Sequence, residues 1–383
     1  DVAGLTVTAL DPTGAGDTFS GTTVALLQQG AHPVRAARRG TAVAAEMVQR
    51  VGPTVLLEPP PAPMAPVDSR CRVDRPTIAR IAPAVAGLAE VEAFPFVGPL
   101  FPPPGHPRAL DVFFAATLQQ FGFWITEEER YARPMIASLG GEALKGSDFL
   151  WAAYRRWLGE APSDLTPEGQ SRMTLALLTL RLRDDDGNAP LPALEARLRL
   201  AGSFGRDLLA MGTTPQAIVA TANLQPRPVA ALLSALDHLG GYKEDPLRKK
   251  SALLALILRQ RPEGFLRRVE GDAIPPIVDY HVQRGCLRTG VVRVDDAALA
   301  GRLTDRRLVE PADERAVRQA SYQAMLELVE ASGRPMEVVD GFFFRNRTRC
   351  PEMTDPDCGA CPLDDVCAKE KRLFQPVHRT TYY

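Results

Sequence analysis

The sequence predicts a mainly α-helical protein that begins with a short α/β segment. From Arg108 onward the apolar residues recur three and four positions apart, which is the spacing of one helix face. Residues 1–57 read as a strand, a glycine loop and two helices, and residues 58–84 are rich in proline. The predicted organisation is therefore an N-terminal segment at 1–57, a linker at 58–84 and a helical domain at 85–383.

Composition narrows the class of protein. The 383 residues carry a formal net charge of −1 and 45% hydrophobic residues, with a sequence pI of about 6.6. No apolar run is long enough to span a bilayer and no signal-peptide pattern is present, so we expect a soluble, cytoplasmic protein without a membrane partner. A dedicated nucleic-acid binder is usually more basic than this.

The N-terminal segment contains a candidate anion site. A β-branched run at Leu5–Leu10 precedes residues 11–21, which read D-P-T-G-A-G-D-T-F-S-G. Glycines at 14 and 16 let backbone N–H groups approach an anion at the start of the following helix. Asp17 stands where a carboxylate can accept a proton from an attacking hydroxyl group.

This segment resembles the C-terminal signature of ribokinase-like (PfkB) carbohydrate and nucleoside kinases. The resemblance implies that Asp17 is the catalytic base and that Gly14, Ala15 and Gly16 form the anion hole for the transferred phosphoryl group. It also implies that an intact kinase domain would use ATP and Mg²⁺. Because the segment matches only the end of such a kinase, we expect a truncated kinase domain that lacks the sugar- or nucleoside-binding portion.

The rest of the chain is predicted to be almost entirely helical. Leu110, Phe113, Phe114, Leu118, Phe121 and Trp124 form one apolar stripe, which indicates core. A proline and aromatic cluster at 94–107 is expected to pack onto this domain. Further helices are predicted at Phe149–Leu158, Pro167–Leu182, Leu191–Met211, Pro215–Thr221, Pro228–Leu239, Pro246–Leu258, Asp279–Leu287, Ala312–Ala331 and Met336–Arg345.

Four of the six cysteines lie close together near the end of the chain. Cys350, Cys358, Cys361 and Cys367 have the spacing C-x7-C-x2-C-x5-C. Four thiolates on one loop can hold an iron–sulfur cluster. A zinc site is the first alternative, although only Cys358 and Cys361 form a C-x2-C pair. Disulfides are the second alternative and are rare in cytosolic proteins.

The cysteine loop at 345–375 resembles that of the endonuclease III group of helix-hairpin-helix N-glycosylases, with best matches at 277–290 and 342–375. That family shows C-x6-C-x2-C-x5-C, so this chain has one additional residue in the first gap. Residues 277–284 (I-V-D-Y-H-V-Q-R) resemble the family's V-D-T-H-x-x-R segment. The resemblance implies an endonuclease III-like helical fold, a structural [4Fe-4S] cluster and Asp279 as the catalytic carboxylate.

Asp279 has two interpretations on residue chemistry alone. A carboxylate stabilises the positive charge that develops on a sugar as an N-glycosidic bond breaks. The same residue can instead cap the helix that begins beside it. His281 and Arg284 are candidate substrate-binding residues, and a buried histidine or a salt-bridge arginine is the alternative for each.

The sequence departs from the DNA-cleaving members of that family. Their glycine hairpin of the L-P-G-V-G-x-x-T-A type is missing. The most similar stretch of this sequence is Lys249-Lys250-Ser251-Ala252. Lys250 as a Schiff-base lysine is therefore less favoured than a solvated basic face. Residues 243–268 nevertheless hold eight Lys/Arg against three Asp/Glu, a net of +5 that suits phosphate contacts.

A further resemblance bears on the substrate. Asp279-Tyr280-His281, the run L-D-V-F-F at 110–114 and Gly122-Phe123-Trp124 resemble segments of the queuosine-salvage nucleotide glycosidases. We therefore expect an N-glycosidic bond hydrolase acting on a modified-base nucleotide or nucleoside, or on a damaged base in DNA. The alternatives are a non-catalytic nucleic-acid-binding module that uses residues 243–268, and a protein that is chiefly a truncated kinase.

Overall fold

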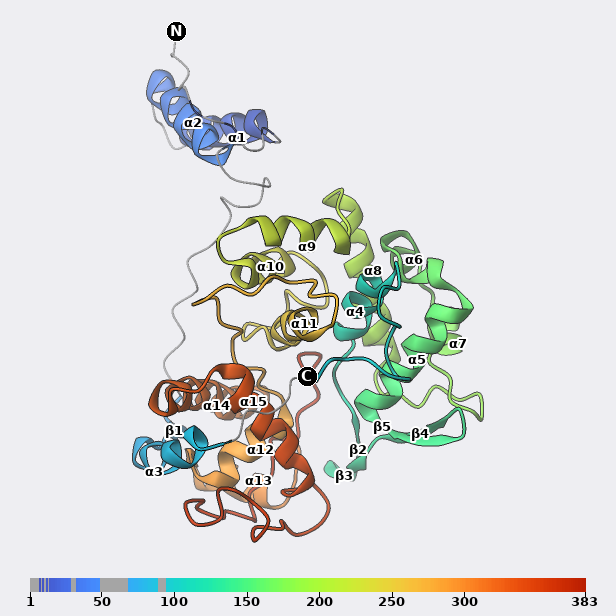
Figure 1. Ribbon diagram of the computed structural model, residues 1–383, viewed down its shortest axis with the longest axis vertical. Helices are drawn as coiled ribbons and strands as arrows, with labels where there is room; N and C mark the ends of the chain where they lie inside the picture. The colour runs from blue at the N-terminus through green and yellow to red at the C-terminus, as the bar shows by residue number, and fades with distance from the viewer. Residues whose placement is uncertain are drawn as a thin grey trace.

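The structure is a computed structural model that describes residues 7, 9, 12, 14–28, 32–48, 68–88 and 94–383. Helices dominate these residues, and the strands form only two-stranded antiparallel sheets (Figure 1). The prediction of a mainly helical protein is therefore confirmed. None of the helices in this part of the chain is both long and apolar enough to cross a membrane.

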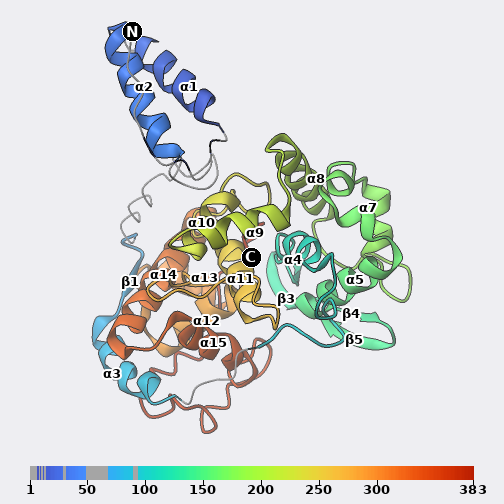
Figure 2. The same cartoon turned by 45° about the horizontal axis from the view of Figure 1, so that its top comes forward.

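The N-terminal segment forms a helical hairpin. Helices α1 (Ala15–Gln28) and α2 (Pro33–Met47) pack against each other (Figure 2). Gly40 of α2 allows this close approach, because a Cβ atom there would lie 2.9 Å from the Phe19 carbonyl oxygen of α1. Most of the strand expected at Leu5–Leu10 lies outside the described residues.

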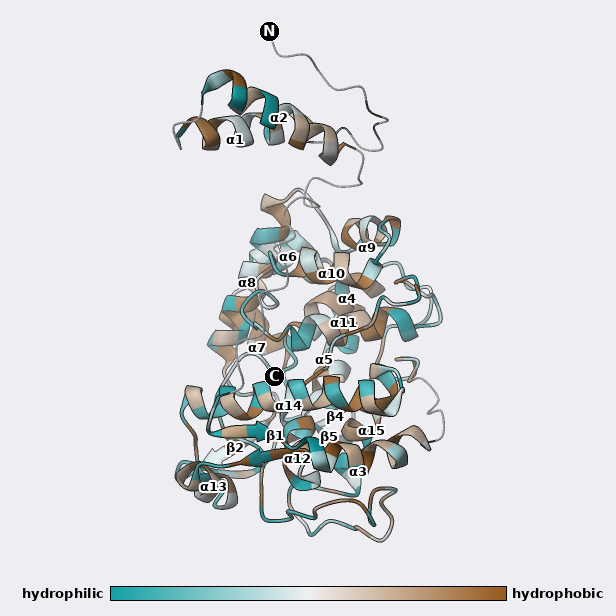
Figure 3. Ribbon diagram, turned by 90° about the vertical axis from the view of Figure 1, so that its left-hand side faces the viewer, coloured by the Kyte–Doolittle hydropathy of each residue, from teal (hydrophilic) through white to brown (hydrophobic). Residues whose placement is uncertain are grey.

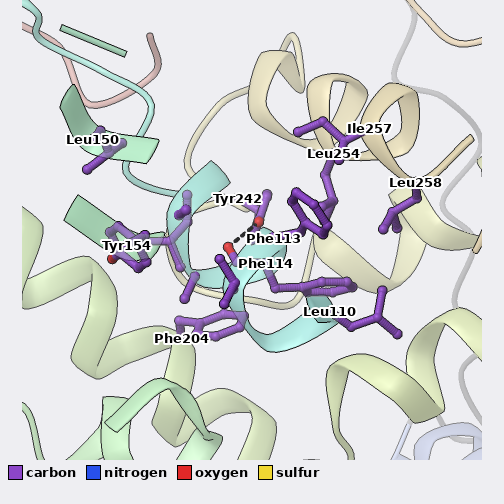
Figure 4. Packing of buried hydrophobic residues seen from close by; sticks show 14 of the residues in the cluster. Leu110, Phe113, Phe114, Leu150, Tyr154, Phe204, Tyr242, Leu254, Ile257 and Leu258 are labelled. Atoms are coloured by element: carbon purple, nitrogen blue, oxygen red, sulfur yellow. Dashed lines mark hydrogen bonds between the residues drawn. The ribbon is translucent and has the colours of Figure 1, made fainter. Parts of the chain in front are cut away.

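A first lobe is built around α4 (Ala109–Thr117), all of whose residues are buried. It is packed by α5 (Gly146–Glu160), α9 (Pro215–Leu224) and α11 (Lys249–Gln260), and α4 shows mostly apolar colours in Figure 3. The residues of the predicted apolar stripe are buried as expected, but they do not share one helix face, because α4 ends at Thr117 and Trp124 begins strand β2. Figure 4 shows Phe113 and Phe114 in this core, where the Tyr242 hydroxyl donates to the Phe114 carbonyl at 2.6 Å. The other helical elements of the lobe are η2 (Pro162–Leu165), α6 (Pro167–Ser171), α7 (Leu175–Arg181), α8 (Leu194–Ala210) and α10 (Pro228–Leu236).

Two β-hairpins that the sequence did not predict interrupt the helices of this lobe. Strand β2 (Trp124–Glu127) pairs with β3 (Arg130–Pro134), and β4 (Ile136–Leu139) pairs with β5 (Glu142–Lys145). The first turn holds two glutamates in the left-handed region, and the second is made by two glycines with φ of 67° and 79°. Glycine favours such a turn, whereas paired glutamates give no turn signal, so periodicity alone missed the first hairpin.

The second lobe is formed by chain segments from the start and from the end of the region after residue 68. Strand β1 (Cys71–Val73) pairs with β6 (Val292–Val294), and α3 (Arg75–Ala86) packs on α14 (Pro311–Ser332). The β1–β6 sheet, α3 and α14 form the lobe together with α12 (Tyr280–Thr289), α13 (Ala297–Thr304), α15 (Met336–Arg345) and η3 (Asn346–Thr348). The expectation of a linker does not hold for residues 71–84, because Ile78, Ile81 and Val85 of α3 are in the core of this lobe.

Local hydrogen bonds explain why two helices differ from the bounds that the sequence predicted for them. The Thr174 hydroxyl caps α7, so the helix predicted at Pro167–Leu182 is two helices rather than one. Helix α11 begins at Lys249 instead of Pro246. The Asp245 carboxylate accepts the N–H groups of Leu247 and Lys249, while Arg248 has a left-handed φ of 54°.

A buried ion pair joins the two lobes. Asp245, which precedes α11 of the first lobe, accepts two hydrogen bonds from the Arg318 guanidinium of α14, at 2.8 and 2.7 Å. Both side chains are almost fully buried. Arg318 also donates from Nε to the Val278 carbonyl at 3.2 Å. This pair therefore sets the position of α11 relative to the chain segment just before α12.

We expect Arg318→Met to destabilise the protein by about 3–5 kcal/mol, because Asp245 would keep its buried charge without a partner. Urea unfolding at pH 7 measures this loss. Arg315→Met on the exposed side of the same helix is the matched control and should change stability by about 0.5 kcal/mol or less. Equal stability of the two variants would show that the pair does not hold the lobes together.

Candidate functional site

A cavity of about 620 Å³ is lined by residues of both lobes. Its walls come from the segment 94–101, the start of α5, one face of α11, the start of α12, and α15 with η3. This volume lies within the range of small-molecule sites in proteins.

One side of the cavity is aromatic. Phe94, Phe96 and Phe101 pack edge to face, with ring centroids 4.8 to 5.7 Å apart, and Phe101 contacts Trp151 of α5 at 5.3 Å. All four line the cavity, as do Phe123 and Phe344. The expectation that the proline and aromatic cluster packs onto the helical domain is met by the burial of Phe96 and Phe101. Flat rings of this kind suit a planar heterocycle.

Asp279 also lines this cavity, at the start of α12. Its Oδ1 atom accepts hydrogen bonds from the backbone N–H groups of His281 at 2.8 Å and Val282 at 2.9 Å. Asp279 is thus the helix N-cap that residue chemistry alone suggested, and it also lines the cavity. The two interpretations of Asp279 are compatible, because both backbone donors bind the same oxygen.

Two ionisable groups that sequence reasoning did not select share this part of the cavity. Burial, and then the nearby charge of Asp279, raise the pKa of Asp340 on α15 to about 8. Burial lowers the pKa of Lys249, and the Asp279 carboxylate partly opposes this shift. Lys249 donates from Nζ to the Gln120 carbonyl at 3.2 Å. Asp279, Asp340 and Lys249 are therefore two buried carboxyl groups and a buried amine that line the same cavity, whose wall also includes Asp148 and Glu337.

The two candidate substrate-binding residues, His281 and Arg284, lie in different positions relative to the cavity. His281 lines the cavity, and burial followed by the neighbouring Arg284 keeps the pKa of its imidazole well below the ordinary value. Arg284 is not among the cavity-lining residues. It lies behind the wall, where it donates to Gln375 Oε1 at 2.7 Å and approaches the Cys350 carbonyl. Arg284 thus joins α12 to the cysteine loop.

Glu352 connects the cysteine loop to the cavity wall. This buried carboxylate accepts a short hydrogen bond from the Tyr131 hydroxyl. It also lies 3.4 Å from Lys145 Nζ and 3.3 Å from His281 Nδ1, and both of these residues line the cavity. The loop that carries the cysteines therefore supplies a charged contact directly behind the cavity.

The basic segment 243–268 is not a solvated face. Lys249, Lys250, Arg259 and Arg261 are buried. Lys250 donates to the Leu118 carbonyl at 2.9 Å, and burial lowers its pKa to about 7. Four further cations of the segment bond to partners of the chain: Lys243 to Asp207, Arg248 to Asp237, and Arg267 and Arg268 to backbone carbonyls. This segment therefore lacks the exposed, unpaired cations that a phosphate-binding face needs.

The four loop cysteines face one small cavity. All of them line it together with Arg288 and Asn346, and none is in a disulfide. Cys350 Sγ accepts from Arg288 at 3.2 Å, and Cys367 Sγ accepts from the Lys369 N–H at 3.3 Å. Such donors stabilise thiolates. Within the described ranges, no group of three or more His, Cys, Asp or Glu side chains is arranged to hold a single metal ion.

The predicted anion loop of the N-terminal segment is described from Gly14 onward. Gly14 has a left-handed φ of 78°, α1 begins at Ala15, and Asp17 is exposed in its first turn beside Gly16. The Ala15 N–H donates to the Pro12 carbonyl at 3.2 Å, and the following Gly16 and Asp17 are exposed at the helix start. The described residues show no contact between Asp17 and the cavity of the helical lobes.

Comparison with known proteins identifies a similarity for this N-terminal segment. Residues 2–59 match the family model described as pfkB family carbohydrate kinase. This agrees with the resemblance expected from residues 11–21. The search of curated proteins found no match for the chain.

Proposed function

We propose that the two helical lobes form an N-glycosidic bond hydrolase with an endonuclease III-like helical fold. Its substrate would be a nucleotide or nucleoside with a modified base. The observation that carries the proposal is Asp279, whose carboxylate lines a cavity with an aromatic wall. The sequence resemblances at residues 277–284 and 110–124 support the same assignment.

The position of Asp279 suits charge stabilisation. Two backbone N–H groups bind Oδ1, which favours the ionised carboxylate and fixes its direction. Breaking the bond between C1′ and the base nitrogen creates positive charge on the sugar. A buried carboxylate next to C1′ stabilises this charge more strongly than water does, because the cavity has a lower dielectric constant.

Two observations favour a small substrate over duplex DNA. The cavity volume of about 620 Å³ fits a nucleotide. Segment 243–268, which was the candidate phosphate face, has its cations buried or bonded within the chain. The same finding argues against a non-catalytic nucleic-acid-binding module based on that segment. DNA with a damaged base remains a substrate class for the experiment below.

We expect the protein to release free base from ribonucleosides or 5′-monophosphates, with 7-deazapurine compounds included in the set and damaged duplex DNA tested beside them. Asp279→Asn should reduce release by roughly 10²–10⁴-fold, because the amide keeps the helix cap but loses the negative charge. Chromatographic detection of the free base is the measurement.

Asp296→Asn is the matched control for this experiment. Asp296 caps α13 through the Leu299 N–H at 2.8 Å and lies outside the cavity. Base release in this variant should equal that of the unmodified protein. A rate that is the same in Asp279→Asn and Asp296→Asn would remove Asp279 from the mechanism, and no release by the unmodified protein would refute the hydrolase.

We also propose that Cys350, Cys358, Cys361 and Cys367 hold a structural [4Fe-4S] cluster. Four unpaired thiols lining one cavity, with N–H donors at two of the sulfurs, fit this group. When bound, the cluster would cross-link the loop 345–375, and the base-release reaction does not pass through it. Arg288 would offset part of its negative charge.

Protein purified without oxygen should contain about four iron and four sulfide ions per chain and absorb visible light. Cys358→Ala should lose most of this iron, whereas Cys71→Ala, which removes a buried thiol outside the loop, should keep it. Elemental analysis is the measurement. One zinc ion per chain, or no metal, would contradict the cluster.

The family match supports a second function for an intact kinase domain that includes this N-terminal segment, namely phosphoryl transfer from ATP with Mg²⁺ to a sugar or nucleoside. Asp17 would accept the proton of the attacking hydroxyl group, and the backbone at Gly14, Ala15 and Gly16 would bind the transferred phosphoryl group. The exposed first turn of α1 is compatible with both roles.

Sugar-dependent or nucleoside-dependent formation of ADP by an intact kinase domain that contains this segment tests this function. Activity should fall by roughly 10²–10⁴-fold in Asp17→Asn, because the amide cannot accept the proton. Reactions without the acceptor are the control. Formation of ADP at the same rate in both proteins would show that Asp17 is not the base.

A further inference from the structure

Asp340 faces the same cavity as Asp279 from a different helix. It lies in the middle of α15, is 5% exposed, and its Oδ1 atom accepts the Ile277 N–H at 3.2 Å. Ile277 is two residues before Asp279, so one short backbone segment holds both carboxyl groups. Both groups line the cavity beside Lys249.

The two carboxyl groups differ in their hydrogen bonds. Asp279 accepts two backbone N–H groups, which stabilise its ionised form, whereas Asp340 accepts one. Burial and the charge of Asp279 raise the pKa of Asp340 to about 8. Asp340 therefore keeps its proton at pH 7 beside a second carboxyl group that is bound by two N–H donors, and acid–base catalysis uses a protonated acid of this kind.

The groups around Asp340 do not reverse this assignment. From α11, Lys249 opposes the shift, and Arg259 is engaged by Asp272 and Glu337. From α12, Asp279 strengthens the shift, and the Cys286 thiol is neutral because burial raises its pKa to about 12. Glu337 of α15 adds negative charge, and Arg318 of α14 is bound by Asp245.

We propose that Asp340 is the general acid that protonates the departing base, an inference that rests on the proposed hydrolase function. The C1′–N bond breaks and its electron pair stays on the base, which takes the proton from Asp340. Water adds its oxygen to C1′ and gives a proton to Asp279. Transfer of this proton to Asp340 through solvent restores both groups, so the products are free base and the sugar hydroxyl.

Two probes with different leaving groups test this role. The base of 7-deazaguanosine 5′-monophosphate needs a proton to depart, whereas p-nitrophenyl β-D-ribofuranoside 5-phosphate releases a stable phenolate. In Asp340→Asn, hydrolysis of the first should fall by roughly 10²–10⁴-fold, and hydrolysis of the second should stay within about tenfold. The amide oxygen of asparagine can still accept the Ile277 N–H.

The pH profile gives an independent readout. For 7-deazaguanosine 5′-monophosphate, kcat/KM of the unmodified protein should fall as the pH rises above about 8, because Asp340 then loses its proton. This fall should be missing in Asp340→Asn. Asp111→Asn is the control, since Asp111 is another buried aspartate with a raised pKa but lies outside the cavity and bonds to Gln216.

The possible outcomes distinguish failure of the acid role of Asp340 from failure of the proposed hydrolase function. If Asp340→Asn loses hydrolysis of both probes equally, or of neither, Asp340 is not the acid while the hydrolase stands. If the unmodified protein hydrolyses neither probe, the hydrolase fails for nucleotides, and the acid role fails with it. Thermal unfolding of Asp340→Asn shows whether an equal loss comes from misfolding. In that case Asp340→Glu, which keeps the acid, is tested instead. Asp340→Glu should recover selective hydrolysis of the nucleotide, and failure to do so would refute the acid role.

Discussion

The buried pair of Asp245 and Arg318 is the interaction on which the cavity depends. Asp245 binds the N–H of Lys249 as well as the guanidinium of Arg318, and Arg318 binds the carbonyl of Val278. The pair therefore holds the residues adjacent to Lys249 and Asp279 from two different lobes. Arg259 of α11 also contacts Glu337 of α15 at 3.3 Å, so the Asp245–Arg318 pair fixes the width of the cavity together with this second contact.

Such a pair is costly to bury and is stable only when its remaining hydrogen-bonding capacity is used. Burial would raise the pKa of Asp245, but the charge of Arg318 and the backbone donors lower it below the ordinary value. The Arg318 guanidinium also lies over the Tyr383 ring at 4.9 Å. Tyr383 lines the cavity and bonds through its hydroxyl to Glu314 at 2.7 Å. The polar network thus extends from the lobe junction to the cavity wall.

Sequence reasoning located what depends on local spacing. It placed most helices, the buried stripe around Phe113, and Asp279 at a helix start, because helix periodicity and capping are local properties. It did not find Asp340, which lies on the buried face of α15 with Met336 and Phe343 and acquires its character from burial beside Asp279. It also read segment 243–268 as exposed, since the partners of Lys250 and Arg261 are more than 130 residues away or in irregular loops. Long-range contacts of this kind leave no periodic signal.

Through Glu352, the cysteine loop affects the charge at the wall of the cavity. Its carboxylate is the counter-charge for Lys145 and Arg284, and it lies beside the neutral imidazole of His281 at the back of the cavity. If the loop separates from α12, an anion is withdrawn from that wall, and Lys145 is left to find another negative partner. The integrity of the thiol-bearing segment therefore sets the electrostatic potential that an incoming anion meets, at a distance from the sulfurs themselves.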